Sequence, residues 1–130
     1  MRTVFRKLKM RVREHGGNDL TPSQVSVVLR LERDGPATVS SLARAESMRP
    51  QSMSAIVAPL QKSGLIRGAA DASDGRQTLM SLTPKCQKWL QEGRAARQDW
   101  IATTIAQKLS VQEQEKLRAA LELLARLVED

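Results

Sequence analysis

The chain has 130 residues, of which 41% are hydrophobic, and this composition suits one globular domain with a buried core rather than a disordered chain. Its formal net charge of +7 favours a polyanionic partner such as nucleic acid, although a basic protein without such a partner would carry the same charge. One cysteine and one histidine exclude an internal disulfide and a zinc site built from four Cys or His ligands.

Several classes of protein are disfavoured by what the sequence lacks. No apolar stretch reaches the roughly 20 residues that a membrane-spanning helix needs. The basic N-terminal segment has no long apolar block behind it, unlike a secretory signal, so we expect a cytoplasmic protein without a membrane partner. We find no phosphate-binding loop, zinc-protease motif or nucleophile elbow, and therefore expect no catalytic residues, no metal ion and no cofactor.

Two helices are expected at the start of the chain. Apolar residues at helical spacing predict the first over 3–14, and the pair Gly16-Gly17 ends it. Thr21 and Gln24 form the pattern of a capping box around a first-turn proline, which predicts that the second helix begins at Pro22. Its expected buried residues are Val25, Val28 and Leu29.

A helix-turn-helix follows. After a short extended segment at 37–39, Ser40 is expected to cap a third helix over 41–46, with Leu42 and Ala45 facing inward. A fourth helix begins at Pro50 and ends before Gly64, a favoured position for a C-terminal glycine. Its expected apolar stripe is Met53, Ile56, Val57 and Leu60. In a helix-turn-helix, the second helix lies in the DNA major groove.

A hairpin and two helices complete the chain. Segments 65–70 and 77–82 predict two short strands joined by a polar turn. Thr83 and Pro84 predict the start of a helix of about 25 residues, roughly 37 Å long, which is more than so small a domain can cover. Ser110 predicts the cap of a last helix with heptad-like leucine spacing. The apolar stripes of these two helices predict a partner chain.

The outward side of the fourth helix suits a major groove, because glutamine and serine can bond base edges and alanine can touch a thymine methyl group. No acidic residue occurs from Ser47 to Ala70. At the hairpin tip, Arg76 can enter a minor groove, and we expect Asp74 to orient it and Asp71 to position the turn. The alternatives are an ordinary solvated helix and a local Asp-Arg pair. The DNA-binding candidates are Ser40, Arg49, Pro50, Gln51, Ser52, Ser54, Ala55, Lys62, Ser73, Asp74 and Arg76.

Taken in order and at their spacings, four motifs resemble the MarR family of bacterial transcription regulators. They are Leu20-Thr21-Pro22-Ser23-Gln24, Arg49-Pro50-Gln51-Ser52-Met53-Ser54, Lys62-Ser63-Gly64-Leu65-Ile66-Arg67, and Asp71-x-x-Asp74-Gly75-Arg76 followed by Leu82-Thr83. The resemblance implies a single domain over 1–130 with a mainly α (α+β) fold. A winged helix-turn-helix lobe with a two-stranded wing would occupy 20–83, and dimerisation helices would occupy 1–19 and 84–130.

The resemblance also implies a function. It implies a homodimeric repressor that binds a pseudo-palindromic operator in double-stranded DNA, with Gln51, Ser52 and Ser54 near bases and Arg76 in the minor groove. It further implies release by a small aromatic or anionic ligand, or regulation by oxidation. The rival interpretations are a winged-helix module that binds protein rather than DNA, and a basic first helix that binds an anionic membrane.

Some residues depart from the family pattern or concern regulation. Ala55 and Pro59 stand where many members carry arginine or another polar residue, and Pro59 should kink the helix or weaken its last turns, so we expect modest operator affinity. We expect Cys86 to be a buried structural thiol; the alternative is a sensor whose pKa a helix N-terminus lowers. The candidates for a ligand site are Arg13, His15 and Met48.

Overall fold

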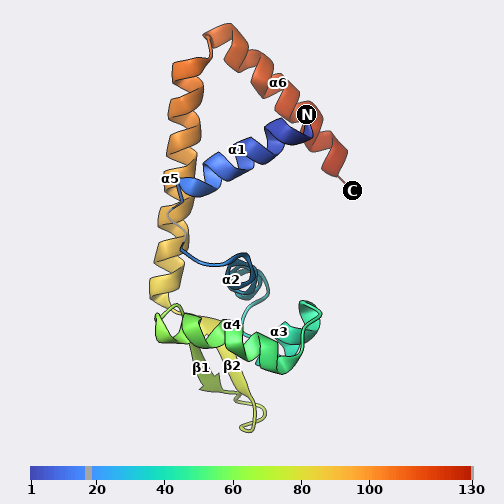
Figure 1. The fold of residues 1–130 in the computed structure, drawn as a ribbon, viewed down its shortest axis with the longest axis vertical. Helices are drawn as coiled ribbons and strands as arrows, with labels where there is room; N and C mark the ends of the chain where they lie inside the picture. Colours follow the sequence, from blue (N-terminus) through green and yellow to red (C-terminus); the bar gives the residue numbers. More distant parts are fainter. Residues whose placement is uncertain (17–18, 130) are drawn as a thin grey trace. The chain divides into compact units, whose positions relative to one another are not determined.

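The computed structural model describes residues 1–16 and 19–129, and the chain divides into two compact units. We call residues 18–92 the lobe, and residues 1–17 with 93–130 the helical unit. The elements follow the expected order of helices and hairpin (Figure 1). They are α1 (Arg2–Glu14), α2 (Pro22–Asp34), α3 (Val39–Ala45), α4 (Pro50–Lys62), β1 (Ile66–Ala70), β2 (Thr78–Leu82), α5 (Pro84–Lys108) and α6 (Val111–Val128).

The predicted mainly α fold with a two-stranded wing is confirmed. Helix α1 ends at Glu14, close to the expected end; Gly17, the second residue of the expected terminator, lies outside the described residues. Within the described ranges, no helix is both long enough and apolar enough to cross a membrane.

Helix α2 opens with the predicted capping box. The hydroxyl of Thr21 accepts the backbone N–H of Gln24 at 3.2 Å, and the Gln24 side chain accepts the N–H of Thr21 at 2.9 Å. The expected buried face is partly wrong, because the buried residues are Val27, Val28 and Leu31, whereas Leu29 is 43% exposed. Apolar residues occur on more than one side of α2, so their spacing alone did not select the core side.

Helix α3 begins two residues earlier than expected, and its cap is Thr38 rather than Ser40. The Thr38 hydroxyl accepts the backbone N–H of Ser41 at 3.0 Å, and Ser40 lies in the first turn. This shift changes which residues face inward: Leu42 and Ala43 are buried, while Ala45 is exposed. The expected extended segment is confirmed at Ala37, which forms an antiparallel bridge with Met80 of β2.

The core of the lobe forms around α4. Met53, Val57 and Leu60 are fully buried, and Ile56 is partly buried against the same cluster, which confirms the predicted stripe. The cluster also contains Leu42 of α3, Ile66 of β1, Met80 of β2 and Cys86 of α5. Burying each large side chain contributes about 1.5–3 kcal/mol, so the core fixes which side of α4 faces water. Helix α4 continues past Pro59 to Lys62, so the proline does not end it.

One hydroxyl group links the turn after the C-terminal end of α4 to the start of α5. Gly64 follows α4 with a φ of +80°, a conformation that favours glycine. The Thr83 hydroxyl donates to the carbonyl oxygen of Gly64 at 2.6 Å and accepts the backbone N–H of Cys86 at 3.2 Å. Thr83 therefore caps α5, as predicted, and also holds the turn that leads into the wing.

In the helical unit, the two terminal helices expose apolar side chains. Helix α6 begins with the predicted capping box between Ser110 and Glu113. Neither α1 nor α6 contains a buried residue in the described chain. The exposed apolar residues of these helices include Val4, Phe5, Leu8, Leu121, Leu123, Leu124, Leu127 and Val128. Apolar surface of this extent predicts a partner that covers it.

Candidate nucleic-acid interface

The surface side of α4 carries the side chains that the sequence proposed as DNA readers. Gln51, Ser52, Ser54, Ala55 and Lys62 are all exposed, while the opposite side of the helix is buried in the core. Arg49 is the N-cap residue and makes no capping hydrogen bond with its side chain, and Pro50 is the first helical residue. The structure therefore presents an exposed, acid-free helix surface with a basic residue at each end.

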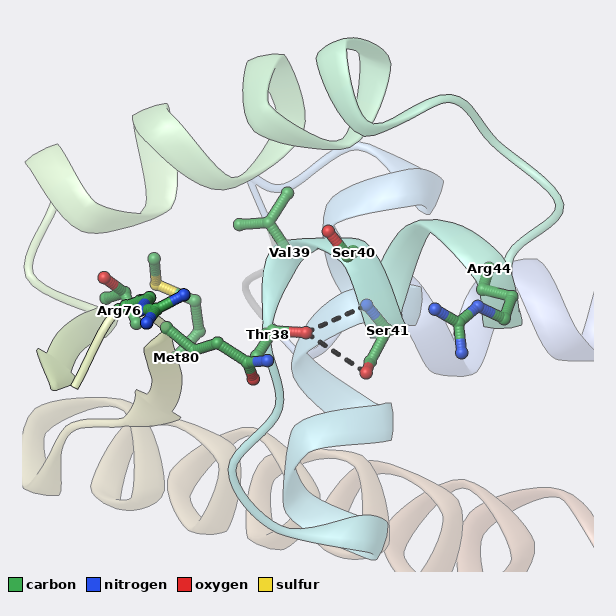
Figure 2. Close-up of a pocket in the computed structure, with 9 residues that line it drawn as sticks. Thr38, Val39, Ser40, Ser41, Arg44, Arg76 and Met80 are labelled. Carbon is green, nitrogen blue, oxygen red and sulfur yellow. Dashed lines mark hydrogen bonds between the residues drawn. The ribbon is translucent and has the colours of Figure 1, made fainter. Parts of the chain in front are cut away.

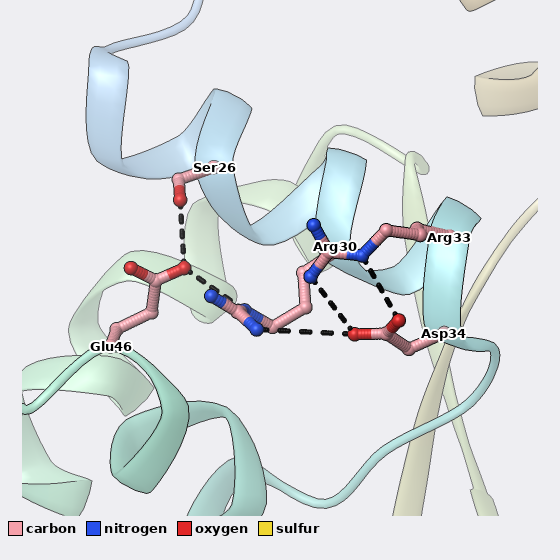
Figure 3. A network of polar contacts seen from close by, with 5 residues as sticks. All are labelled: Ser26, Arg30, Arg33, Asp34 and Glu46. Atoms are coloured by element: carbon pink, nitrogen blue, oxygen red, sulfur yellow. Dashed lines mark hydrogen bonds and ion pairs between the residues drawn. The ribbon is translucent and has the colours of Figure 1, made fainter. Parts of the chain in front are cut away.

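A polar network holds the turn that precedes α4 (Figure 3). Glu46, the residue after α3, accepts a hydrogen bond from the Ser26 hydroxyl at 2.7 Å and one from Nε of Arg30 at 3.1 Å. Both donors belong to α2. The next residue, Ser47, has a φ of +56°, and Met48 donates its N–H to the carbonyl oxygen of Ala43 at 2.8 Å. The network thus fixes the chain where it reverses between α3 and α4.

The same network explains a shifted pKa. The hydrogen bond from Ser26, followed by that from Arg30, lowers the pKa of Glu46 below the ordinary value of a glutamate. Arg30 also lies 3.9 Å from Asp34, which is paired with Arg33 at 3.0 Å. Two of the arginines of the lobe are therefore paired with acids on or next to α2.

The wing turn is shaped by two aspartates. Asp71 accepts the backbone N–H of Ser73 at 3.0 Å and its hydroxyl at 2.9 Å, and these bonds lower the pKa of Asp71. Asp71 therefore positions the turn, as expected. The expectation for Asp74 is wrong in part: its carboxylate accepts the backbone N–H of Arg76 at 3.1 Å rather than the guanidinium group. Asp74 holds the main chain of the wing and leaves the Arg76 side chain exposed.

A polar cleft lies between α3 and the wing (Figure 2). Its volume is about 530 Å³. None of its lining residues is acidic; they are Thr38, Val39, Ser40, Ser41, Arg44, Arg76, Gln77, Thr78 and Met80. It brings together Ser40 and Arg76, which the sequence had proposed for DNA binding, with Ser41 and Arg44, which it had not. Arg44 follows Ser40 by four residues, the spacing of one helix face, but α3 is too short for that spacing to stand out.

The three ligand candidates are divided between the two units. His15 bonds the carbonyl oxygen of Arg11 through Nδ1 at 2.8 Å, and its ring stacks on Trp100 with centroids 4.6 Å apart. Arg13 is exposed on α1, in the helical unit that also contains His15. Met48 belongs to the lobe and packs against its core.

Cys86 is a buried thiol. It is fully buried, and burial, with a smaller contribution from Glu32, raises the pKa of its thiol. The alternative of a pKa lowered by the helix N-terminus is therefore contradicted, because desolvation of the thiolate dominates. Across residues 1–16 and 19–129, no group of three His, Cys, Asp or Glu side chains is placed to hold a metal ion.

Comparisons with known proteins agree with this geometry. The MarR family profile matches residues 20–78. An uncharacterised HTH-type transcriptional regulator of Mycobacterium bovis is 35% identical over 108 residues, which cover 83% of this chain and 75% of the relative. A Pseudomonas aeruginosa protein described as a transcriptional regulator has a crystal structure that is 33% identical in sequence, with a TM-score of 0.79 over 97% of this chain and 89% of that one.

A further solved structure shares the fold at lower identity. A mutant of Staphylococcus aureus MepR bound to an oligodeoxyribonucleotide is 21% identical, with a TM-score of 0.77 over 98% of this chain and 94% of that one. At this identity the likeness concerns the arrangement of helices and wing.

The Glu46 network yields a pH-dependent prediction. We expect Glu46→Gln to lower the free energy of unfolding by about 1–2 kcal/mol at pH 7, because it weakens charge-assisted hydrogen bonds. The pKa of Glu46 is lowered in the folded state, so its contribution is complete above the unfolded pKa and is lost as the pH falls through the folded pKa. Urea unfolding at pH 7 and at pH 3 should therefore show the two proteins converging in acid.

A control variant is available on α6. Glu122 pairs with Arg118 on an exposed surface, and Glu122→Gln should change stability little at either pH. A difference between wild type and Glu46→Gln that is equally large at pH 3 would contradict the role given to the carboxylate.

Proposed function

The chain belongs to the MarR family, and from this premise we propose that it is a transcriptional regulator that binds specific sequences of double-stranded DNA and performs no catalysis. One observation carries the proposal: the lobe buries one side of α4 and leaves the other side exposed, free of acidic residues and rich in small or hydrogen-bonding groups. Such a surface suits a major groove, which is about 12 Å wide and admits one helix.

Each candidate residue has a role in this arrangement. Gln51, Ser52 and Ser54 read base edges, and Ala55 touches a thymine methyl group. Arg49, at the start of α4, binds a phosphate near the N–H groups of the first turn, where Pro50 is the first helical residue. Phosphate contacts from Lys62 and Ser40 position the lobe. The wing places Arg76 in the minor groove, with Ser73 and Asp74 shaping its tip.

We propose that the regulator is a homodimer built from the helices at 1–19 and 84–130, with the DNA-binding winged helix-turn-helix at 20–83. The unburied apolar residues of α1 and α6 support this assembly. Two lobes related by a twofold axis would read a pseudo-palindromic operator with half-sites one helical turn apart, about 34–36 Å.

The proposed mode of regulation rests on the membership of this chain in the MarR family. We propose a cytoplasmic repressor that a small aromatic or anionic ligand releases from its operator. A screen of such compounds against the preformed protein–DNA complex would identify a ligand by loss of the complex.

Selection of bound sequences from random double-stranded DNA tests the function directly. We expect enrichment of one inverted repeat, and binding that weakens steeply with salt because phosphate contacts release counterions. If no sequence is enriched, or if binding hardly changes with salt, the alternative of a winged-helix module that binds protein would be favoured.

Arg76→Ala tests the wing. We expect weaker operator binding with an unchanged unfolding transition, because the Arg76 side chain is exposed and only its backbone N–H shapes the turn. Gel shifts at matched salt measure the effect, and Arg33→Ala removes the same charge elsewhere on the lobe as a control. Equal affinities of Arg76→Ala and wild type would refute the minor-groove assignment.

Gln51→Ala tests base reading by α4. Loss of a bidentate contact to adenine should cost about 1–3 kcal/mol on the selected operator and little on random DNA. Fluorescence anisotropy with the operator and with random DNA measures the loss of specific and of non-specific binding separately. An equal loss on both would show that Gln51 contacts the backbone rather than a base.

Leu127→Glu tests the dimer. Leu127 is 79% exposed on α6, so a charge is tolerated there in a monomer but is buried in the proposed interface. We expect sedimentation equilibrium to show a dimer for wild type and a monomer for the variant, with Leu29→Glu on α2 as the exposed control. A wild-type chain that sediments as a monomer would contradict the assembly.

A further inference from the structure

The cleft between α3 and the wing carries an inference beyond the roles already given. One wall is the first turn of α3 with Thr38, Ser40 and Ser41, and the other is the start of β2 with the preceding wing residues. The polar side chains in this cleft are all neutral or basic.

Pairing with carboxylates distinguishes the arginines of α2 from those of this cleft. Arg30 is bonded to Glu46, and Arg33 is bonded to Asp34, so both are neutralised by carboxylates. For Arg44 and Arg76, the described residues provide no hydrogen-bond or ion-pair partner to either guanidinium group. Both arginines that line the cleft are therefore without a protein partner among the described residues.

The hydrogen bonds of the first turn leave a donor for a ligand. The Thr38 hydroxyl accepts the backbone N–H of Ser41 at 3.0 Å and donates its own proton to the Ser41 hydroxyl oxygen at 3.1 Å. The proton of the Ser41 hydroxyl remains to be donated elsewhere. Arg44 follows Ser41 by three residues, which places the two side chains on neighbouring positions of one helix face.

We propose that Ser41 and Arg44 bind a phosphate of the DNA backbone in this cleft. The proposal rests on the DNA-binding function given above. It adds a contact with the DNA backbone between the major groove, which α4 enters, and the minor groove, which Arg76 enters. Arg44 and Arg76 lie toward opposite ends of the cleft, with the hydroxyl groups of α3 between them (Figure 2). An extended site with a cation at each end suits a polyanion with regularly spaced phosphates better than a compact ion.

Arg44→Ala is the principal test. Because a phosphate contact carries no sequence information, the variant should bind the selected operator and random DNA more weakly by the same factor, about 10-fold. The slope of log K against log salt concentration should become shallower by about 0.9, the value for one lost phosphate contact. Arg33→Ala removes the same charge outside the cleft and should leave this slope unchanged. Thermal unfolding of each variant checks that the fold is intact.

Methylphosphonate substitution of single linkages in the operator tests which atom is bound. With wild type, neutralising any contacted linkage should weaken binding, and with Arg44→Ala one of these linkages in each half-site should lose its effect while the others keep theirs. Ser41→Ala should weaken binding less and leave the salt slope unchanged, since it removes a hydrogen bond but no charge.

The outcomes separate this inference from the proposed function. If wild type selects an operator but Arg44→Ala changes neither affinity nor salt slope, the phosphate site is wrong while the function stands. If wild type binds no DNA, the proposed function itself fails. The remaining alternative is a small free anion, which calorimetric titration with pyrophosphate tests. If wild type binds pyrophosphate and Arg44→Ala does not, while the salt slope of DNA binding is the same for both proteins, the cleft binds a free anion and the proposal is overturned.

Discussion

The packing of Met53, Val57 and Leu60 into the core of the lobe is the constraint on which the interface depends. A helix turns by about 100° per residue, so burial of one stripe fixes the direction of every other side chain on α4. The exposed side is then the only one available to DNA. Small residues on that side let the helix approach base edges closely, and the core prevents the helix from rotating to present another surface.

Pairing with carboxylates separates the arginines of α2 from the two that line the cleft. Arg30 and Ser26 hold Glu46, and this contact fixes the chain just before the turn at Ser47 that sets the direction of α4. Arg44 and Arg76 have no carboxylate partner among the described residues and keep their charge for an external anion. A basic net charge alone does not show this division, because it counts paired and unpaired guanidinium groups alike.

Local signals in the sequence predicted the elements well, and long-range contacts explain what was missed. The caps at Thr21, Thr83 and Ser110 depend on residues three positions apart, so the sequence displays them. Thr38 and Ser40 are both good caps, and only the bridge from Ala37 to β2 shows which one precedes the helix. Similarly, Ser26 and Glu46 are 20 residues apart, and the cleft is lined by residues of α3 and of the wing. Contacts between such distant residues leave no regular spacing in the sequence that could predict them.

The proposed dimer resolves the tension between a sparsely charged helix α4 and an operator that must be distinguished from other DNA. On the exposed side of α4, Ala55, Ala58 and Pro59 have no side-chain hydrogen-bonding group. One lobe alone would therefore make few strong contacts with a DNA groove. When a dimer has bound one half-site, its second lobe meets the other half-site at a high effective concentration, and two modest affinities combine into a strong one. The apolar residues of α1 and α6 would then contribute to DNA recognition without touching DNA, because their burial in a dimer makes operator binding depend on protein concentration.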